Sequence, residues 1–211
     1  AIVVNGSTAA AGESRSVLSS NGANIPADLY YLEDPNRDLT IREIAGRTVK
    51  WKNNENRYVN FGYSRSAYWF RVDIHNPRRA RQEVLLEIDF PSLDLVDFYV
   101  PDGHGGFGEV KTGDLRVFES RPIRDPNFLI PVPLEPGVST VYMRVQNDGS
   151  LRFTVRLYTG RGFLEKKDLV LPRLWLLYGM LLLVAGFYLF VFALLRKPVY
   201  LHFALFSSTL F

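Results

Sequence analysis

One stretch of this chain limits its possible folds more than any other. Residues 174–195 read LWLLYGMLLLVAGFYLFVFALL and contain no charged side chain. A helix of this length spans about 33 Å, which exceeds the roughly 30 Å hydrocarbon core of a bilayer. Trp175 and Tyr178 lie near its upstream end, as aromatic residues at a membrane interface often do. We predict a transmembrane helix over residues 174–195; the less favoured alternative is a fully buried helix of a soluble protein.

A second apolar run follows after a short basic turn. Arg196 and Lys197 precede Pro198, and residues 199–211 are again largely apolar. This pattern predicts a helical hairpin whose second transmembrane helix starts at residue 199 and is truncated at residue 211. Because cytoplasmic loops are enriched in Lys and Arg, we expect the turn in the cytoplasm and the residues before the first helix outside.

The segment before the apolar run is predicted to be all-β. Runs of β-branched and aromatic residues alternate with turn signals of Gly, Pro, Asn and Asp. The spacing of these runs favours a β-sandwich or jelly roll over βαβ units. Residues 40–45 are predicted as a short helix, with Asp38 as a candidate N-cap. The clearest predicted strands are 48–52, 68–75, 83–90, 95–100, 128–133, 140–146 and 151–159.

These patterns divide the chain into five segments. Residues 1–25 are predicted to be either a signal-peptide remnant or a disordered leader, and the sequence supports both equally. Residues 26–162 are the predicted sandwich domain, and residues 163–173 are a juxtamembrane linker. The predicted transmembrane helix at 174–195 and the truncated helix at 199–211 complete the chain.

Alternation along the predicted strands separates an apolar face from a polar face rich in aromatic residues. The second face pools Trp69, Arg71, Asp73, Glu87, Asp89, Tyr142, Arg144, Arg152, Arg156 and Tyr158. If these strands share one sheet, its outer face presents aromatic rings among charged groups. Such a surface suits a sugar, whose C–H face stacks on a ring while its hydroxyls bond to Arg and carboxylates. The alternative is a solvated sheet face held by cross-strand pairs, without any ligand.

The composition argues against several classes of function. The formal net charge is +3 without a clustered basic stripe, so we expect no nucleic-acid partner. The chain has no cysteine, and its three histidines lack metal-ligand spacing, so we expect neither a metal nor another cofactor. Glu87 and Asp89 are a weak candidate pair for a glycosidase, and no nucleophile motif accompanies them. We therefore expect that this segment is not an enzyme.

The order of motifs resembles that of one family of bacterial membrane receptors. The motifs are similar to the second type of extracellular sensor domain, joined to the start of the membrane bundle, in seven-transmembrane receptors with diverse intracellular signalling modules. The stretches that carry the resemblance are YYLEDPNRDLTIREI (30–44), FGYSRSAYWFRVDIHNP (61–77), LLEIDFPSLDLVDFYV (85–100), TGDLRVFESRPI (112–123), TVYMRVQNDGSLRFTVRLYT (140–159) and LYGMLLLVAGFYLFVFALLRKPVYLHFALF (177–206).

The resemblance implies a jelly-roll-like sensor domain, related to carbohydrate-binding domains, outside the bacterial inner membrane. Seven helices and a cytoplasmic output such as a histidine kinase or diguanylate cyclase would follow. The implied partner is a carbohydrate or related small molecule. The alternative function is a protein–protein or dimerisation module, because Trp, Tyr and Arg also anchor interfaces.

The resemblance also indicates recurrent positions in this chain. Some of them suit turns and strand ends: Gly62, Asn76 and Gly113. Asp114 belongs to the same pattern. The residues predicted to bind the ligand are Trp69, Arg71, Arg121, Tyr142 and Arg144.

Overall fold

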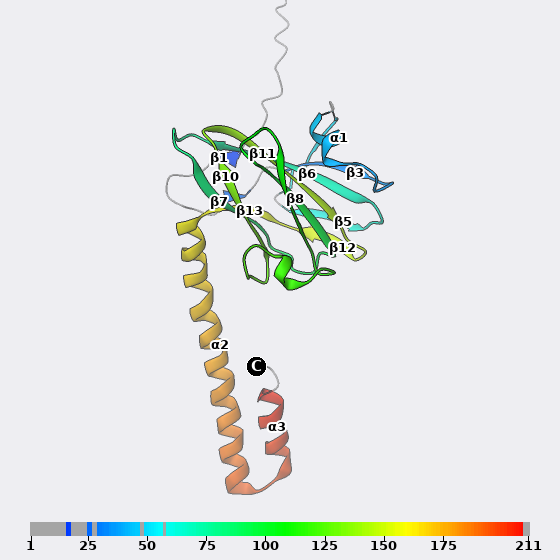
Figure 1. The fold of residues 1–211 in the computed structure, drawn as a ribbon. Helices are drawn as coiled ribbons and strands as arrows, with labels where there is room; N and C mark the ends of the chain where they lie inside the picture. Colours follow the sequence, from blue (N-terminus) through cyan, green and yellow to red (C-terminus); the bar gives the residue numbers. More distant parts are fainter. Residues whose placement is uncertain (1–15, 18–24, 27–28, 47–48, 57, 209–211) are drawn as a thin grey trace, which may run out of the picture. The chain divides into compact units, whose positions relative to one another are not determined.

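The structure is a computed structural model that describes residues 16–17, 25–26, 29–46, 49–56 and 58–208 (Figure 1). The chain divides into two compact units, Ala1–Phe163 and Leu164–Phe211. The elements, in chain order, are β1 (Ser16–Val17), β2 (Ile25–Pro26), β3 (Tyr30–Asp34), α1 (Ile41–Gly46), β4 (Lys52–Asn53), β5 (Val59–Tyr63), β6 (Ala67–Asn76), β7 (Gln82–Ile88), β8 (Leu95–Pro101), β9 (Phe107–Thr112), the 3₁₀ turn η1 (Phe118–Ser120), β10 (Phe128–Leu134), β11 (Gly137–Gln146), β12 (Ser150–Phe153), β13 (Val155–Thr159), α2 (Gly160–Leu195) and α3 (Pro198–Ser208).

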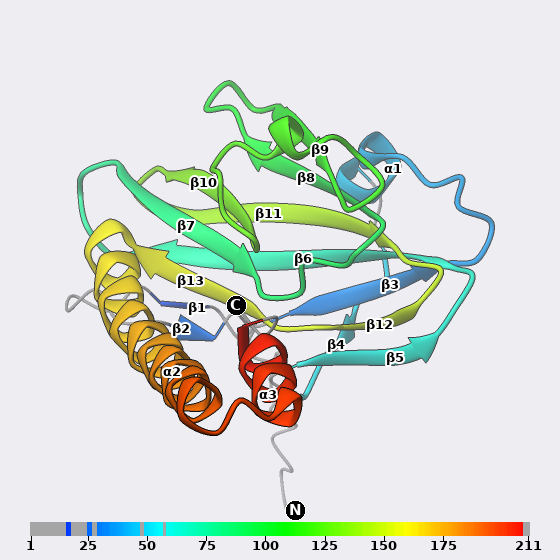
Figure 2. The ribbon, with the colours of Figure 1, turned by 90° about the horizontal axis from the view of Figure 1, so that it is seen from below.

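The first unit is a β-sandwich (Figures 1 and 2). Among the described residues, one sheet of seven strands has the order β4-β3-β6-β11-β8-β9, with β1 added parallel to β6. A second sheet of four strands has the order β10-β7-β13-β2, and β12 pairs with β5 in a two-stranded ribbon. Apart from β1, all these pairings are antiparallel. The predicted all-β sandwich is confirmed.

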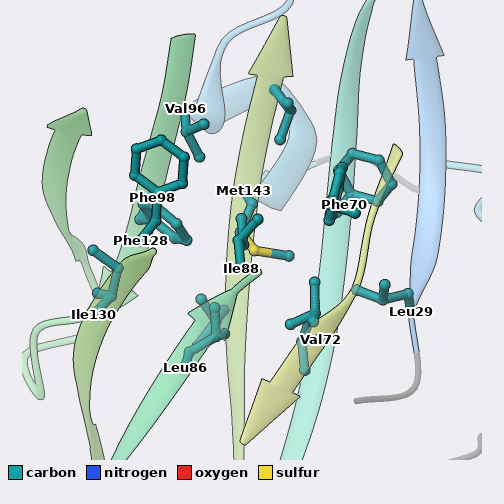
Figure 3. Close-up of a cluster of buried hydrophobic side chains, with 14 of the residues drawn as sticks. Leu29, Phe70, Val72, Leu86, Ile88, Val96, Phe98, Phe128, Ile130 and Met143 are labelled. Carbon is teal, nitrogen blue, oxygen red and sulfur yellow. The ribbon is translucent and has the colours of Figure 1, made fainter. Parts of the chain in front are cut away.

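One apolar core lies between the two large sheets (Figure 3). The seven-stranded sheet contributes Phe70, Val72, Val96, Phe98 and Met143, and the four-stranded sheet contributes Leu86, Ile88, Phe128 and Ile130. Each of these side chains is at most 1% exposed. For β6, β7 and β11 this is the face that alternation predicted, because every second side chain of a strand points the same way. Burial of a side chain of this size contributes about 1.5–3 kcal/mol to folding.

The prediction of a single strand over residues 151–159 is wrong. The chain forms β12 up to Phe153 and β13 from Val155, and the two strands belong to different sheets. Between them, the Thr154 N–H donates to the Asp89 carboxylate at 2.7 Å, and the Thr154 carbonyl accepts from the Asp89 N–H at 3.2 Å. The strand can therefore change sheets without leaving a buried backbone group unpaired. The alternation of inward and outward side chains continues through Thr154, because Phe153 and Val155 both enter the core.

The predicted short helix is present, but its N-cap is Thr40 and not Asp38. The Thr40 carbonyl accepts hydrogen bonds from the N–H groups of Glu43 and Ile44, at the start of α1. The Glu43 carboxylate accepts the Thr40 backbone N–H at 3.1 Å. This is the reciprocal bond of a capping box, in which Glu follows the N-cap by three positions. The Glu spacing therefore selects Thr40, although Asp is by itself an equally good N-cap.

Strand pairing begins upstream of the predicted domain boundary at residue 26. β1 pairs with β6, and β2 pairs with β13. The segment 1–25, predicted as a signal remnant or leader, thus includes strand residues at 16–17 and 25, and the rest of it lies outside the described residues. The predicted strand 48–52 is represented by β4 alone, and Thr48 also lies outside the described residues.

The helix α2 is continuous from Gly160 to Leu195, so the predicted linker 163–173 is helical along with the apolar run. Its part Leu174–Leu195 is, by length and composition, able to cross a membrane. In the second unit, α2 is followed by Arg196 at φ +48°, where the helix ends.

The second unit is a helical hairpin. Pro198 begins α3, a position where its missing N–H costs no helical hydrogen bond. Tyr188 of α2 stacks on Phe203 of α3 with 5.3 Å between ring centroids. Small residues, Ala185 and Ala204, are buried within this unit. The two helices therefore pack through an aromatic contact and small side chains.

We expect the substitution Gly113→Ala to destabilise the sandwich strongly. Gly113 has a φ of +142°, and a Cβ there would lie 2.1 Å from the carbonyl oxygen of Asp94. Backbone strain and overlap together should cost about 3 kcal/mol or more, measured as a lower midpoint of thermal unfolding. The control is Gly46→Ala, where no atom lies within 4 Å of the added Cβ. Similar midpoints for the two variants would contradict this account of Gly113.

Candidate functional site

The outer face of the seven-stranded sheet carries most of the residues predicted to bind a ligand. The strands β3, β6, β11, β8 and β9 pair so that their outward side chains form rows across the sheet. Side chains that are neighbours in such a row are close enough to interact. One row contains Tyr30, Arg71, Tyr142, Tyr99 and Glu109, and the next contains Leu32, Trp69, Arg144, Asp97 and Lys111.

The condition that all these polar strands share one sheet is not met. β7 pairs with β10 and β13, and not with β6, so its outward residues lie on the other side of the sandwich. Some of these residues do not lie on the outer face of the seven-stranded sheet. They are Glu87, Asp89, Arg156 and Tyr158, which lie on or next to strands of the four-stranded sheet, and Arg152, which lies on the β12–β5 ribbon. The residues that remain together are Trp69, Arg71, Asp73, Tyr142 and Arg144.

Trp69 lies in the second row and is fully buried. Its ring stacks on Tyr99 with 5.4 Å between centroids, and Ile44 of α1 and Tyr142 belong to the same apolar cluster. At 0% exposure, Trp69 has no ring face available to a sugar. Its predicted role as a ligand contact is therefore corrected to that of a packing residue beneath α1. Alternation predicts which face a side chain takes, but not what covers that face.

Arg71 forms a two-point ion pair with Asp73, which lies two positions along the same strand. Its Nη2 is 2.7 Å from Oδ2 of Asp73, and its Nε donates to Oδ1 at 3.1 Å. Thr140 Oγ1 donates to the same carboxylate at 2.7 Å. The Asp73 side chain is 2% exposed and that of Arg71 is 28% exposed. The buried Asp73 carboxylate therefore holds the Arg71 guanidinium, which is still in contact with solvent. Burial raises the pKa of the neighbouring Tyr142 hydroxyl, and Arg71 opposes that shift.

Arg144 and Arg116 share the buried carboxylate of Asp97. Arg116 Nη1 lies 2.6 Å from Oδ1, and Arg144 Nη1 lies 3.9 Å from Oδ2. Arg144 Nη2 also donates to the backbone carbonyl of Arg37 at 3.2 Å. Because the Arg144 side chain is only 16% exposed, it connects the sheet to the β3–α1 loop from a largely shielded position.

Arg121 is not brought together with the other predicted residues. It follows η1, and its Nη1 donates to the carbonyl of Asp125 at 2.9 Å and to that of Pro126. Its guanidinium lies 4.5 Å from the centroid of the Phe128 ring. These contacts close the loop that leads into β10, and they give Arg121 a structural role apart from the outer face.

A pocket of about 540 Å³ opens where three connections of the sandwich meet, and none of its residues was predicted. It is lined by Arg37, Tyr63, Ser64, Arg65 and Asp148. Tyr63 is the last residue of β5, and the others come from the β3–α1, β5–β6 and β11–β12 connections, whose strands end side by side (Figure 2). The volume is within the range of about 300–1,000 Å³ that is common for small-ligand sites. The available signal was the sequence Tyr63-Ser64-Arg65, which places an aromatic residue and a cation in a turn.

The described residues contain no group of three or more His, Cys, Asp or Glu side chains placed to hold a metal ion. The outer sheet face and the pocket contain ion pairs, hydroxyls and aromatic rings.

Residues 26–159 match the profile of the family described as 7TMR-DISM extracellular 2, which is more than half of the chain. The chain belongs to this family. The match confirms the resemblance found in the sequence, and the sandwich is an extracellular domain of a seven-transmembrane receptor family. The apolar run Leu174–Leu195 lies after this domain in the chain, so the protein is membrane-anchored with the domain outside.

Among solved structures, the chain is similar to CsCBM6-3 from Clostridium stercorarium, which was determined in complex with cellobiose. The identity is 8% and the TM-score is 0.23, over 61% of this chain and 92% of that chain. This similarity is too low to support an inference about the ligand of this chain. None of the curated proteins matches the chain.

We expect the stability of the sandwich to fall in alkaline solution. Burial raises the pKa of the hydroxyls of Tyr68, Tyr99 and Tyr142. Above about pH 10 the unfolded chain loses tyrosine protons that the folded chain retains, so it binds fewer protons and stability decreases as the pH rises. Thermal unfolding between pH 8 and about pH 11 measures this slope.

The variant Tyr142→Phe removes one of these retained protons, and its stability should fall less steeply above pH 10. The control is Tyr63→Phe, which changes a side chain that is 84% exposed. A Tyr142→Phe profile that runs parallel to those of the parent and the control would contradict the assignment.

Proposed function

We propose that this chain is the ligand-sensing part of a bacterial receptor in the inner membrane. The sandwich, on the periplasmic or extracellular side, binds a carbohydrate or a related small molecule. The helices pass the signal to a cytoplasmic output module, such as a histidine kinase or a diguanylate cyclase. The observation that carries the proposal is that β13 ends at Thr159 and α2 begins at Gly160, with no linker between them.

The junction of β13 and α2 is held on the sandwich side by several contacts. The backbone N–H of Gly162 donates to Oγ1 of Thr159 at 3.2 Å, which caps the first turn of the helix. Phe163 packs edge-on against Tyr158, with 5.8 Å between centroids, and both join Leu129 in a buried cluster. A shift of β13 therefore moves the first turn of α2 with it.

Strand β13 is in turn tied to the rest of the sandwich. Val155–Thr159 pairs with β7 along its whole length, and Leu157 lies in the core. A ligand changes such an equilibrium only if it binds one arrangement of the domain more tightly than the other. A ligand with that preference would change the position of β13, and α2, which contains Pro172 before the apolar run, would carry the change to that run.

A Gly-Gly insertion after Lys167 is expected to uncouple the helix from the sandwich while leaving ligand binding intact. Each Gly disfavours the helix by about 1 kcal/mol, and two added residues rotate the downstream helix by roughly 200°. The chain has no cysteine, so a spin label on the variant Leu194→Cys reports on that position alone.

The experiment uses the chain in nanodiscs and a thermal-shift screen against cell-wall sugars and exopolysaccharides. A sugar that raises the unfolding midpoint should change the mobility of the label in the parent and not in the insertion variant. The control inserts Gly-Gly after Gly105, in the exposed β8–β9 hairpin, and should retain the response. An undiminished response with the insertion after Lys167 would contradict transmission through α2, and a screen without any shift would contradict sugar sensing.

A second candidate function is protein–protein interaction or dimerisation. It is favoured by an exposed apolar patch next to η1, in which Leu115 is 70%, Val117 is 71% and Phe118 is 47% exposed. Single exposed apolar residues are ordinary, but several on one loop are typical of a contact surface.

If this patch associates, sedimentation of the chain in detergent should show a dimer whose fraction rises with concentration. The double variant Leu115→Ser and Val117→Ser should shift the equilibrium toward the monomer by about tenfold or more, because it removes buried apolar area. The control is Tyr58→Ser, at a side chain that is 54% exposed outside the patch. A chain that stays monomeric at every concentration would contradict this second candidate function.

A further inference from the structure

The pocket at Arg37, Tyr63, Ser64, Arg65 and Asp148 combines groups that suit one class of ligand. Its wall contains two guanidinium groups and one carboxylate, a formal balance of +1. The Tyr63 side chain is 84% exposed, so a ring beside these charges presents its apolar surface to water. A partner that stacked on this ring would remove that surface from solvent, which is favourable.

Several polar side chains of the pocket are available to a ligand. Among the described residues, neither the Arg65 guanidinium nor the Tyr63 hydroxyl has a hydrogen-bond or ion-pair partner. Arg37 approaches Asp148 only to 3.9 Å, and their side chains are 35% and 81% exposed. An exposed pair at this distance contributes little stability. The side chains of Tyr63, Arg65 and Asp148 can therefore turn to a ligand without breaking a strong internal contact.

The backbone that carries Arg37 is held in an unusual conformation. Its φ is +63°, which few residues other than Gly adopt. Its Nε donates to the carbonyl of Arg65 at 2.5 Å, and its own carbonyl accepts the hydrogen bond from Arg144. Strain of about 1–3 kcal/mol persists only where surrounding contacts enforce it, and such strain concentrates at functional sites. Arg144, predicted as a ligand contact, is thus a positioning residue for this wall of the pocket.

The β5–β6 turn forms the opposite wall and is also fixed. The backbone N–H of Ser66 and the hydroxyl of Tyr68 lie within hydrogen-bond distance of Ser64 Oγ, each at 3.1 Å. Ser66 Oγ donates to the Glu33 carboxylate at 2.7 Å, which ties the turn to β3. The pocket is therefore pre-formed, and a ligand would not have to order these loops itself.

The geometry points to a binding site for an acidic sugar, a pyranose that carries a carboxylate, in this pocket. The guanidinium groups of Arg37 and Arg65 bind the carboxylate, and the Tyr63 ring stacks on the C–H face of the sugar. Ser64 and Asp148 bond to sugar hydroxyls. A single carboxylate matches the formal balance of +1. This assignment rests on the proposed sensing function, because it names the chemical class of its ligand.

The test is isothermal titration calorimetry of the 211-residue chain in nanodiscs. The probes are galacturonic acid and its methyl ester, which share one sugar ring and differ by one carboxylate charge. We expect the acid to bind about tenfold more tightly than the ester, because its hydrogen bonds to Arg are charge-assisted. Arg65→Ala should abolish that difference, and Arg65→Lys should restore part of it. Tyr63→Ala should weaken both probes by about fivefold.

The matched controls are Arg79→Ala and Tyr58→Ala, at exposed side chains outside the pocket, and both should bind as the parent does. Unfolding midpoints of all variants exclude loss of binding through loss of fold. Equal affinity of the parent for acid and ester, absence of binding, or an unchanged Arg65→Ala variant would each overturn the assignment.

Failure of this assignment is distinguishable from failure of the proposed function. A neutral sugar that raises the unfolding midpoint, with a label response that the insertion after Lys167 removes, would leave sensing intact and overturn only the acidic ligand. Binding of galacturonic acid that never alters the label on Leu194→Cys would establish the site and overturn transmission through α2.

Discussion

The structure depends on β6, a strand that is buried on both faces. Phe70 and Val72 enter the core between the sheets, and Trp69 enters the apolar cluster beneath α1. The strands β3, β11 and β1 pair with it and satisfy its backbone groups. A charged group in such a strand is tolerable only with a partner, which is why Arg71 and Asp73 occur as a close pair. The registers of β3 and β11 against β6 also fix the rows of the outer face.

The inner face of the sandwich could be predicted from the sequence, because alternation with a period of two records which side of a strand is buried. The strands β3, β5 and β9 were missed, since YYLED, VNFGY and FGEVKT carry charges or Gly that break the pattern. The burial of Trp69 was missed for another reason. Trp69 shares its strand face with Arg71 and Asp73, which indicated solvent, and the six-residue α1 covers it through tertiary contacts that no local pattern contains.

The pocket was not predicted, because most of its residues are related by topology and not by spacing. Arg37, Arg65 and Asp148 follow different strands, and they meet because the ends of β3, β5 and β11 lie at the same edge of the sandwich. Strand periodicity carries no information about connections, although binding residues are often located there on a rigid scaffold. The sequence could therefore locate the scaffold residues, such as Arg71 and Arg144, more readily than the residues that line the pocket.

Arg144 shows how scaffold and pocket are connected. A largely buried cation requires partners, and it finds them in Asp97 within the sheet and in the carbonyl of Arg37 in the loop. A ligand that engages the Arg37 side chain therefore acts on a residue whose backbone is tied to β11. The inward residues of β11, such as Met143, pack in the same core as Leu157 of β13, which leads into α2. The outward residues of β6 and β11 therefore hold the pocket loops in a fixed position on the core, and the loops provide the ligand contacts. A sensor requires both the binding loops and their connection to the core. Loops that moved independently of the core could bind a ligand, but the binding event would not reach α2.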